Sequence, residues 1–147
     1  MFNKLVVAFC AVALLAGCSG KKGMMGVDSA LVKDFESKAG DRVHFAFNKS
    51  DITKEAKTTL HRQAEWLKAH PHIRASVQGH CDERGTREYN LALGERRARS
   101  AEKALESHGI HADRLETISY GKERPAVLGT TEEAYAKNRR AVTALQQ

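Results

Sequence analysis

Residues 79–98 read Gly-His-Cys-Asp-Glu-Arg-Gly-Thr-Arg-Glu-Tyr-Asn-Leu-Ala-Leu-Gly-Glu-Arg-Arg-Ala, and the neighbouring elements are arranged around them. The apolar run Ile73–Val77 predicts a strand before this segment, and helical spacing after it continues to about Ser107. Asp82 stands directly behind the predicted strand, and Arg97 lies inside the predicted helix. The pattern predicts a strand, a loop and a helix that hold two opposite charges, and functional side chains often occupy such places.

The composition describes one ordinary domain. The chain has 147 residues, 41% of them hydrophobic, which suffices for a core and is too little for several membrane spans. The formal net charge is +6, with acidic and basic residues interspersed. Because no basic run is interleaved with aromatic residues, we do not expect nucleic acid as a partner.

The first 18 residues have the pattern of a targeting segment. Lys4 precedes a short apolar run, Leu5 to Ala16, which is too short to span a bilayer comfortably. Its end, Leu15-Ala16-Gly17-Cys18, resembles the bacterial lipobox. That resemblance implies removal of residues 1–17, lipidation of Cys18 and, because Ser19 follows, sorting to the outer membrane. The alternative is an ordinary signal peptide with a chance cysteine at the cleavage site.

The mature chain divides into a tether and a folded domain. Residues 18–40 are rich in Gly, Lys and Ser, so we expect a lipidated tether, although segment 29–38 has weak helical character and could fold back. Residues 41–147 are expected to form the domain. Of the three cysteines, Cys10 lies inside the leader, Cys18 stands at its end, and Cys81 alone belongs to the domain, which therefore has no disulfide framework.

The pattern of the domain predicts an α+β fold. The expected strands are 42–47, 73–79, 115–120 and 140–145, and the expected helices are 53–69, 86–107 and, a short one, 132–137. Apolar stripes support both long helices, namely Ala56, Leu60, Ala64 and Leu67 in the first and Leu91, Ala98, Ala101 and Leu105 in the second. We expect two layers, with one mixed sheet of about four strands and the two long helices and the short one packed on one face.

Several motifs carry a family resemblance. Asp82-Glu-Arg-Gly-Thr86, Glu88-Tyr-Asn90 and Leu93-Gly-Glu-Arg-Arg-Ala98 together resemble the OmpA-like peptidoglycan-binding domain family. Within that family they are most similar to one branch, the peptidoglycan-associated lipoproteins (Pal). The resemblance extends over residues 42–146 and implies the two-layer fold expected above.

The resemblance implies a binding pocket for the free end of meso-diaminopimelate in peptidoglycan stem peptides. Asp82 would accept from the ligand's ammonium, and Arg97 would hold its carboxylate through two parallel hydrogen bonds. The remaining implied ligand-binding residues are Phe47, Asn48, Ser50, Asp51, His80, Cys81 and Leu93. The alternative is a plain Asp82–Arg97 ion pair that fixes the loop to the helix.

Individual members of this set have open interpretations. Many Pal-like proteins carry an acidic residue where this chain has Asn48, so a direct charge contact there is in doubt. Asp51 fits a helix N-cap as well as a ligand contact. His80, Cys81 and Asp82 suggest zinc, but three consecutive residues cannot easily face one ion, and we expect no metal. Arg84, Arg87 and Arg96 are interpreted as solvated charges.

The resemblance implies a binding protein and not an enzyme. It implies an outer-membrane lipoprotein that grips peptidoglycan non-covalently, binds TolB and other Tol components, and serves envelope integrity and cell division. No cofactor is expected beyond the lipid on Cys18. The alternatives are a wall anchor of another envelope machine and a wall-modifying enzyme. The only candidate pair for such an enzyme, Cys81 with His80, points to opposite sides of an extended chain.

Overall fold

The computed structural model describes residues 26–147. The expected leader 1–17 and the lipidation site Cys18 lie outside this range. Within it, no helix combines the length and the apolar character that crossing a membrane requires.

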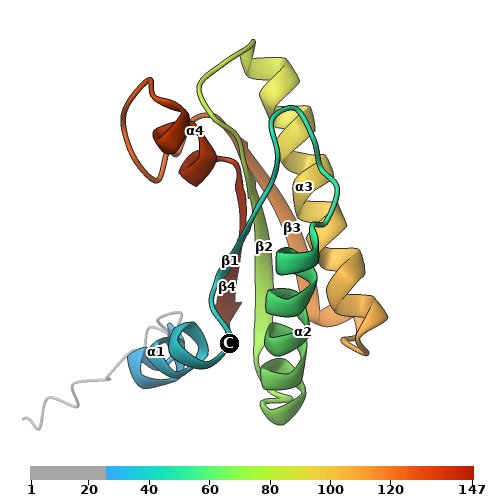
Figure 1. Cartoon of the computed structure of the whole chain (residues 1–147). Coiled ribbons are helices and arrows are strands. Elements are labelled where there is room, and N and C mark those ends of the chain that lie inside the picture. Colours follow the sequence, from blue (N-terminus) through green and yellow to red (C-terminus); the bar gives the residue numbers. More distant parts are fainter. Residues whose placement is uncertain (1–25) are drawn as a thin grey trace, which may run out of the picture.

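Four strands form one mixed sheet in the order β1-β4-β2-β3. These are β1 (Arg42–His44), β2 (Arg74–His80), β3 (Leu115–Gly121) and β4 (Arg140–Gln146). β2 pairs with β3 in parallel, and β4 runs antiparallel between β1 and β2. The long helices α2 (Lys54–Ala69) and α3 (Arg87–Ser107) cover one face, which confirms the α+β two-layer prediction (Figure 1). A 3₁₀ turn, Ala112–Arg114, and the short helix α4 (Glu132–Asn138) complete the domain.

The core lies between the sheet and the two long helices. The predicted stripe of α2 is buried, and β2 alternates so that Ala75 and Val77 face the helices. Gln63 on α2 is also fully buried, which is tolerated because it donates to the Gly40 carbonyl at 2.8 Å and accepts from Thr143 at 2.7 Å. In α3 the predicted stripe is wrong at its first position, since Leu91 is 38% exposed.

Threonines begin the helices α2, α3 and α4. Thr53, Thr86 and Thr131 each accept a hydrogen bond from a backbone N–H three residues on, which satisfies a donor that the first turn leaves unpaired. The N-cap of α2 is therefore Thr53, and the N-cap interpretation of Asp51 is wrong. Gly109 follows α3 with φ of 99°, as expected for a glycine just past a helix end.

The N-terminal helix α1 (Ser29–Lys38) packs against the domain, which confirms the alternative that segment 29–38 folds back, so these residues are not part of the tether. Phe35 is 1% exposed and packs edge-on against Trp66 of α2, with ring centres 5.0 Å apart. The Trp66 indole N–H donates to Asp34 at 2.8 Å. This segment belongs to the fold because its one aromatic side chain completes the core, which a weak helical periodicity cannot reveal.

The first strand is shorter than the predicted span 42–47. Pairing with β4 ends at His44, although the Phe45 N–H still donates to the Arg139 carbonyl. Beyond it the chain leaves the sheet, and Asn48 adopts φ of 57°. The carbonyls of this loop turn towards the side chain of Arg97 on α3, which provides hydrogen bonds that an extended strand would have found in a neighbour.

Helix α3 lies unusually close to strand β2 at two glycines. A Cβ atom on Gly79 would overlap the carbonyl oxygen of Gly94 and lie 2.5 Å from its carbonyl carbon. A Cβ atom on Gly94 would overlap the Ser119 hydroxyl. The helix and the sheet therefore meet backbone to backbone, at the end of β2 that leads into the loop 81–86.

Candidate functional site

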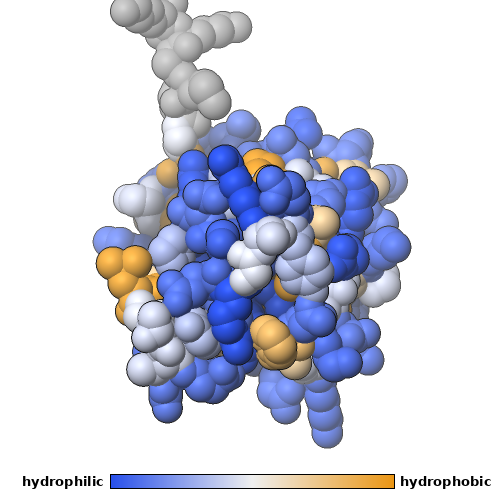
Figure 2. Space-filling view, turned by 90° about the horizontal axis from the view of Figure 1, so that it is seen from above, coloured by the Kyte–Doolittle hydropathy of each residue, from blue (hydrophilic) through white to orange (hydrophobic). Residues whose placement is uncertain are grey.

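A pocket of about 130 Å³ lies where β2 runs into α3. Six of the nine side chains predicted for the site line it, namely Phe47, Asn48, Cys81, Asp82, Leu93 and Arg97. Its wall also contains four residues that the sequence analysis missed, Arg84, Gly85, Tyr89 and Asn90. Seen from this end of the molecule, the surface is largely hydrophilic, with a few separate apolar groups (Figure 2).

Three predicted residues do not line this pocket. Ser50 and Asp51 lie in the segment that leads from the loop to α2, and Asp51 is exposed. His80 is buried, and because successive side chains of a strand alternate, it points to the other face of the sheet from Cys81. Only the His80 carbonyl takes part, as an acceptor for Arg97 at 3.0 Å.

Arg97 is the most deeply buried charge of the site, with 1% of its surface exposed. Its Nε donates to the Lys49 carbonyl at 2.9 Å, Nη1 to the His80 carbonyl at 3.0 Å and Nη2 to the Ala46 carbonyl at 3.2 Å. The side chain thereby ties the loop after β1 to the end of β2. A guanidinium has five N–H groups, so one remains on each terminal nitrogen.

Asp82 is buried, and its partner is Arg84. Its Oδ1 accepts from the Arg84 backbone N–H at 3.1 Å and from Nε at 3.2 Å, and its Oδ2 accepts from Nη2 at 2.8 Å. Arg139 Nη1 lies 3.6 Å from the same Oδ2. Among residues 26–147 the salt bridges do not include Asp82 with Arg97, so the interpretation as a plain pair of these two residues is wrong.

The Asp82 carboxyl is stabilised in its ionised form. Burial acts to raise its pKa, but the hydrogen bonds from Arg84 and the charges of Arg84 and Arg139 outweigh burial, and the pKa falls below its usual value. The pocket therefore contains a fixed anion close to three guanidinium groups.

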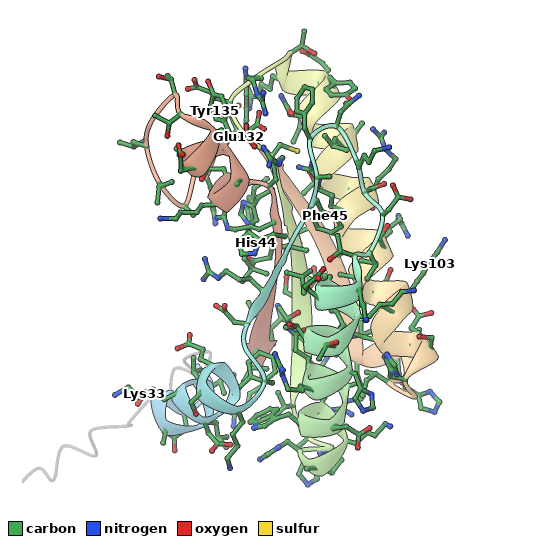
Figure 3. The ribbon with its side chains drawn as sticks, in the orientation of Figure 1. Lys33, His44, Phe45, Lys103, Glu132 and Tyr135 are labelled. Atoms are coloured by element: carbon green, nitrogen blue, oxygen red, sulfur yellow. The ribbon has the colours of Figure 1, made fainter. Side chains whose placement is uncertain are left out.

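Arg84 is not the solvated charge that the sequence suggested. Its guanidinium carbon lies 4.1 Å from the ring centre of Phe47 and 4.3 Å from that of Tyr135, so two aromatic faces hold it above Asp82. Figure 3 shows Tyr135 next to Glu132 of α4 at this end of the molecule. Phe47 and Tyr135 lie about 40 and 50 positions away from Arg84 in the sequence. A pattern within a short segment cannot predict contacts over such a separation.

Asn90 shapes the loop that carries Asp82 and Arg84. Its Nδ2 donates to the carbonyls of Arg84 and Thr86, both at 2.9 Å, and its side chain is buried. Its own carbonyl accepts from the Cys81 thiol at 3.3 Å. Asn90 thus couples the first turn of α3 to the loop.

The cysteine beside the pocket lacks the properties of a nucleophile. Burial raises the pKa of the Cys81 thiol, and a protonated thiol is a poor nucleophile. The neighbouring His80 imidazole lies on the opposite side of the strand and cannot act as its base. Among residues 26–147, no group of three or more His, Cys, Asp or Glu side chains is placed to hold a metal ion.

His80 should make the folded state sensitive to acid. Burial lowers the pKa of its imidazole from 6.5 to about 4, and the charges of Arg140 and Arg124 act in the same direction. The unfolded chain then binds a proton between pH 6.5 and 4 that the folded chain does not, so stability falls as the pH falls through this window. The expected loss is about 3 kcal/mol at pH 4.

Urea unfolding at several pH values, with His80→Gln beside the parent chain, measures this effect. The parent should lose more stability than the variant between pH 6.5 and 4, because other titrating groups are common to both proteins. Parallel curves for the two proteins would show that the folded state accommodates a charged His80.

A four-stranded mixed sheet, with two long helices on one face and a charged pocket at the end of its second strand, defines an OmpA-like α+β domain. The chain belongs to the OmpA family, whose profile matches residues 44–139. Proteins named peptidoglycan-associated lipoprotein are similar over almost the whole length. That of Mesorhizobium japonicum is 45% identical, covering 97% of this chain and 92% of its own. That of Haemophilus influenzae is 43% identical, covering 97% of both chains.

Solved structures agree with this assignment. The crystal structure of the peptidoglycan-associated lipoprotein from Burkholderia pseudomallei superposes with a TM-score of 0.74 at 39% identity, over 79% of this chain and 99% of that one. The periplasmic domain of Helicobacter pylori MotB (residues 78–256) has a TM-score of 0.62 at 18% identity, over 72% of this chain and 74% of that domain. The second likeness concerns the fold alone.

Proposed function

We propose that this chain is a lipid-anchored envelope protein that binds peptidoglycan without catalysing a reaction. The observation that carries the proposal is a pocket in which a buried carboxylate, Asp82, lies beside a buried guanidinium, Arg97, that keeps free N–H groups. The relatives named peptidoglycan-associated lipoprotein support it, because the similarity extends over 97% of this chain.

The proposed ligand is the uncrosslinked end of meso-diaminopimelate, which carries an ammonium and a carboxylate on one carbon. The carboxylate would accept the one free N–H on each terminal nitrogen of Arg97, a planar two-point contact that lysine cannot offer. Asp82 accepts three hydrogen bonds from Arg84 and keeps acceptor capacity for one N–H of the ammonium. Phe47 and Leu93 provide apolar walls for the methylene chain.

Arg84 would adjust when the ligand enters. Its guanidinium already holds the position next to Asp82 that a ligand ammonium would favour, and its side chain is 36% exposed. Because two positive charges would then share one carboxylate, we propose that Arg84 shifts along the faces of Phe47 and Tyr135 while Asp82 takes the ammonium.

The rest of the proposal concerns the envelope. The lipid on Cys18 would hold the protein in the outer membrane while the domain holds the wall, and two linked attachments reinforce each other through effective concentration. We further propose that the protein works with TolB and other Tol components in envelope integrity and cell division, as the family resemblance of residues 82–98 suggests.

Asp82→Asn should reduce wall binding by roughly thirtyfold. The substitution keeps the shape of the side chain and removes its charge, and a hydrogen bond between charged groups contributes about 2 kcal/mol. The measurement is co-sedimentation of residues 26–147 with purified diaminopimelate-type peptidoglycan. Glu88→Gln, which removes an exposed carboxylate from the first turn of α3, is the matched control and should bind like the parent.

The same assay with lysine-type peptidoglycan tests the role of Arg97. A lysine side chain ends in an ammonium and has no carboxylate beside it, so binding should fall to background. Equal binding to both wall types, or to parent and Asp82→Asn, would contradict the pocket proposal and indicate a contact made by net charge or by another face.

A further inference from the structure

Two histidines meet on the outside of the helix pair, far along the chain from each other. His61 lies on α2 and His108 caps the end of α3, and their Nδ1 atoms are 3.4 Å apart. The rings lie edge to face, with centres 4.8 Å apart. Both line an open groove between α2 and α3, so solvent ions can reach them. The pocket described above uses neither residue.

The spacing of the two nitrogens matches a metal chelate. Two imidazoles bound to one ion at about 2.0–2.1 Å, with a tetrahedral angle between them, have their nitrogens roughly 3.3 Å apart. Neutral imidazole nitrogens are preferred ligands of Zn²⁺, Cu²⁺ and Ni²⁺. In the metal-free protein the two Nδ1 atoms share one proton in a hydrogen bond. When both rings carry their proton on Nε2, each Nδ1 has a lone pair for the ion at this spacing.

The surrounding charges are balanced enough to admit a cation. The carbonyl end of α3 faces His108, and a helix C-terminus favours positive charge. Glu65 lies one turn after His61, and hydrogen bonding from Lys68, with smaller contributions from the two histidines, lowers its pKa. Its carboxylate pairs with Lys68 at 2.8 Å, which neutralises that lysine. Two lysines line the groove, Lys57 of α2 and Lys103 of α3, and Lys103 extends away from its helix into solvent (Figure 3).

We propose that His61 and His108 form a two-histidine site for a divalent transition-metal ion that bridges α2 and α3. Because no third His, Cys, Asp or Glu in the described residues is placed as a ligand, water fills the remaining positions. A site of two imidazoles follows the general order of stability, with Cu²⁺ bound more tightly than Ni²⁺ or Zn²⁺. The ion would link the two helices at the end of the domain opposite the pocket.

The site can be tested independently of wall binding. Arg97 and His108 are eleven positions apart along α3 and its C-cap, about 16 Å along the helix axis, so loss of the metal site should leave wall binding unchanged. The experiment uses the full chain in detergent micelles, purified without a histidine tag, and titrates it with NiCl₂ and ZnCl₂ by calorimetry. We expect saturable binding of one ion and a higher thermal midpoint when the ion is present.

His61→Ala and His108→Ala should each abolish this binding and the rise in midpoint. His72→Ala is the matched control, because His72 is exposed and lies outside the groove, and it should bind like the parent. Circular dichroism checks that each variant is folded.

A second measurement needs no substitution. Paramagnetic Ni²⁺ should selectively broaden the imidazole NMR signals of His61 and His108 in the unmodified chain. Absence of saturable binding by the parent, binding by either alanine variant as tight as the parent's, or broadening at other histidines alone would each overturn the proposal.

Discussion

Replacing Arg97 with alanine should lower the free energy of unfolding by about 4 kcal/mol and also abolish wall binding. The side chain donates to three backbone carbonyls from two separate segments, and its removal leaves them without a partner inside a cavity. A buried group left unpaired costs about 1–3 kcal/mol. Once the side chain is gone, water can reach the two carbonyls of the loop after β1. We therefore expect the summed cost for the three carbonyls to stay below three times the upper value for one group.

The measurement is thermal and urea unfolding of residues 26–147, and the expected fall in midpoint is roughly 10–20 °C. Arg97→Lys should recover only part of the stability, because one ammonium cannot follow the planar fork of three acceptors. The matched control is Arg96→Ala, which removes the adjacent, exposed arginine and should change neither property. A fully stable Arg97→Ala protein that fails to bind the wall would mean that the loop holds itself without this side chain.

Among the substitutions that add one methyl group to a glycine, Gly79→Ala should lower the stability of the domain most. The added Cβ would overlap the backbone carbonyl of Gly94, and backbone cannot rotate aside as a side chain can. Helix α3 would have to move off β2 along its N-terminal half, which carries Leu93 and Arg97. We expect a loss of at least about 3 kcal/mol, at the upper end of the cost of overpacking, and a distorted pocket.

Gly94→Ala provides an instructive comparison. Its Cβ would meet the Ser119 hydroxyl, and a Gly94→Ala, Ser119→Ala double variant should regain part of the lost stability, whereas no side-chain truncation can rescue Gly79→Ala. Gly26→Ala, which meets nothing within 4 Å, is the neutral control. Equal unfolding midpoints for Gly79→Ala and the parent would show that helix and sheet separate without cost.

The order and type of the elements could be predicted from the sequence, because both long helices and β2 have clear periodicity. The expected helix 86–107 is found as Arg87–Ser107, and the expected strand 73–79 as Arg74–His80. The end of β1 could not be predicted, since Phe45-Ala-Phe47 has good strand composition. What ends the strand is Arg97, a residue about fifty positions later that takes the loop carbonyls.

The candidate site could be predicted only in part, because some of its contacts are local in the sequence and others come from distant residues. Asp82 and Arg97 both lie in one local unit, residues 79–98, and the motif of this unit can be recognised in the sequence. Arg84, the partner of Asp82, lies in the same unit, but the side chains that hold Arg84 in place, Phe47 and Tyr135, come from other elements. Leu91 shows the converse error, because its helical spacing predicted burial while its side chain is 38% exposed, although its backbone packs against Ser119 and Gly121 of β3.

The places of α1 and of the pocket determine how the domain would respond to mechanical load. Helix α1 and the start of β1 lie at one end of the sheet, and the loop from β2 to α3 lies at the other (Figure 1). If the N-terminal side is anchored and the pocket grips a wall, tension runs nearly parallel to the strands. The three residue pairs between β1 and β4, from Arg42 with Val142 to His44 with Arg140, would then be sheared together and not peeled apart one by one. Such loading requires all the bonds to fail at once, so even a three-residue strand can resist a sustained pull.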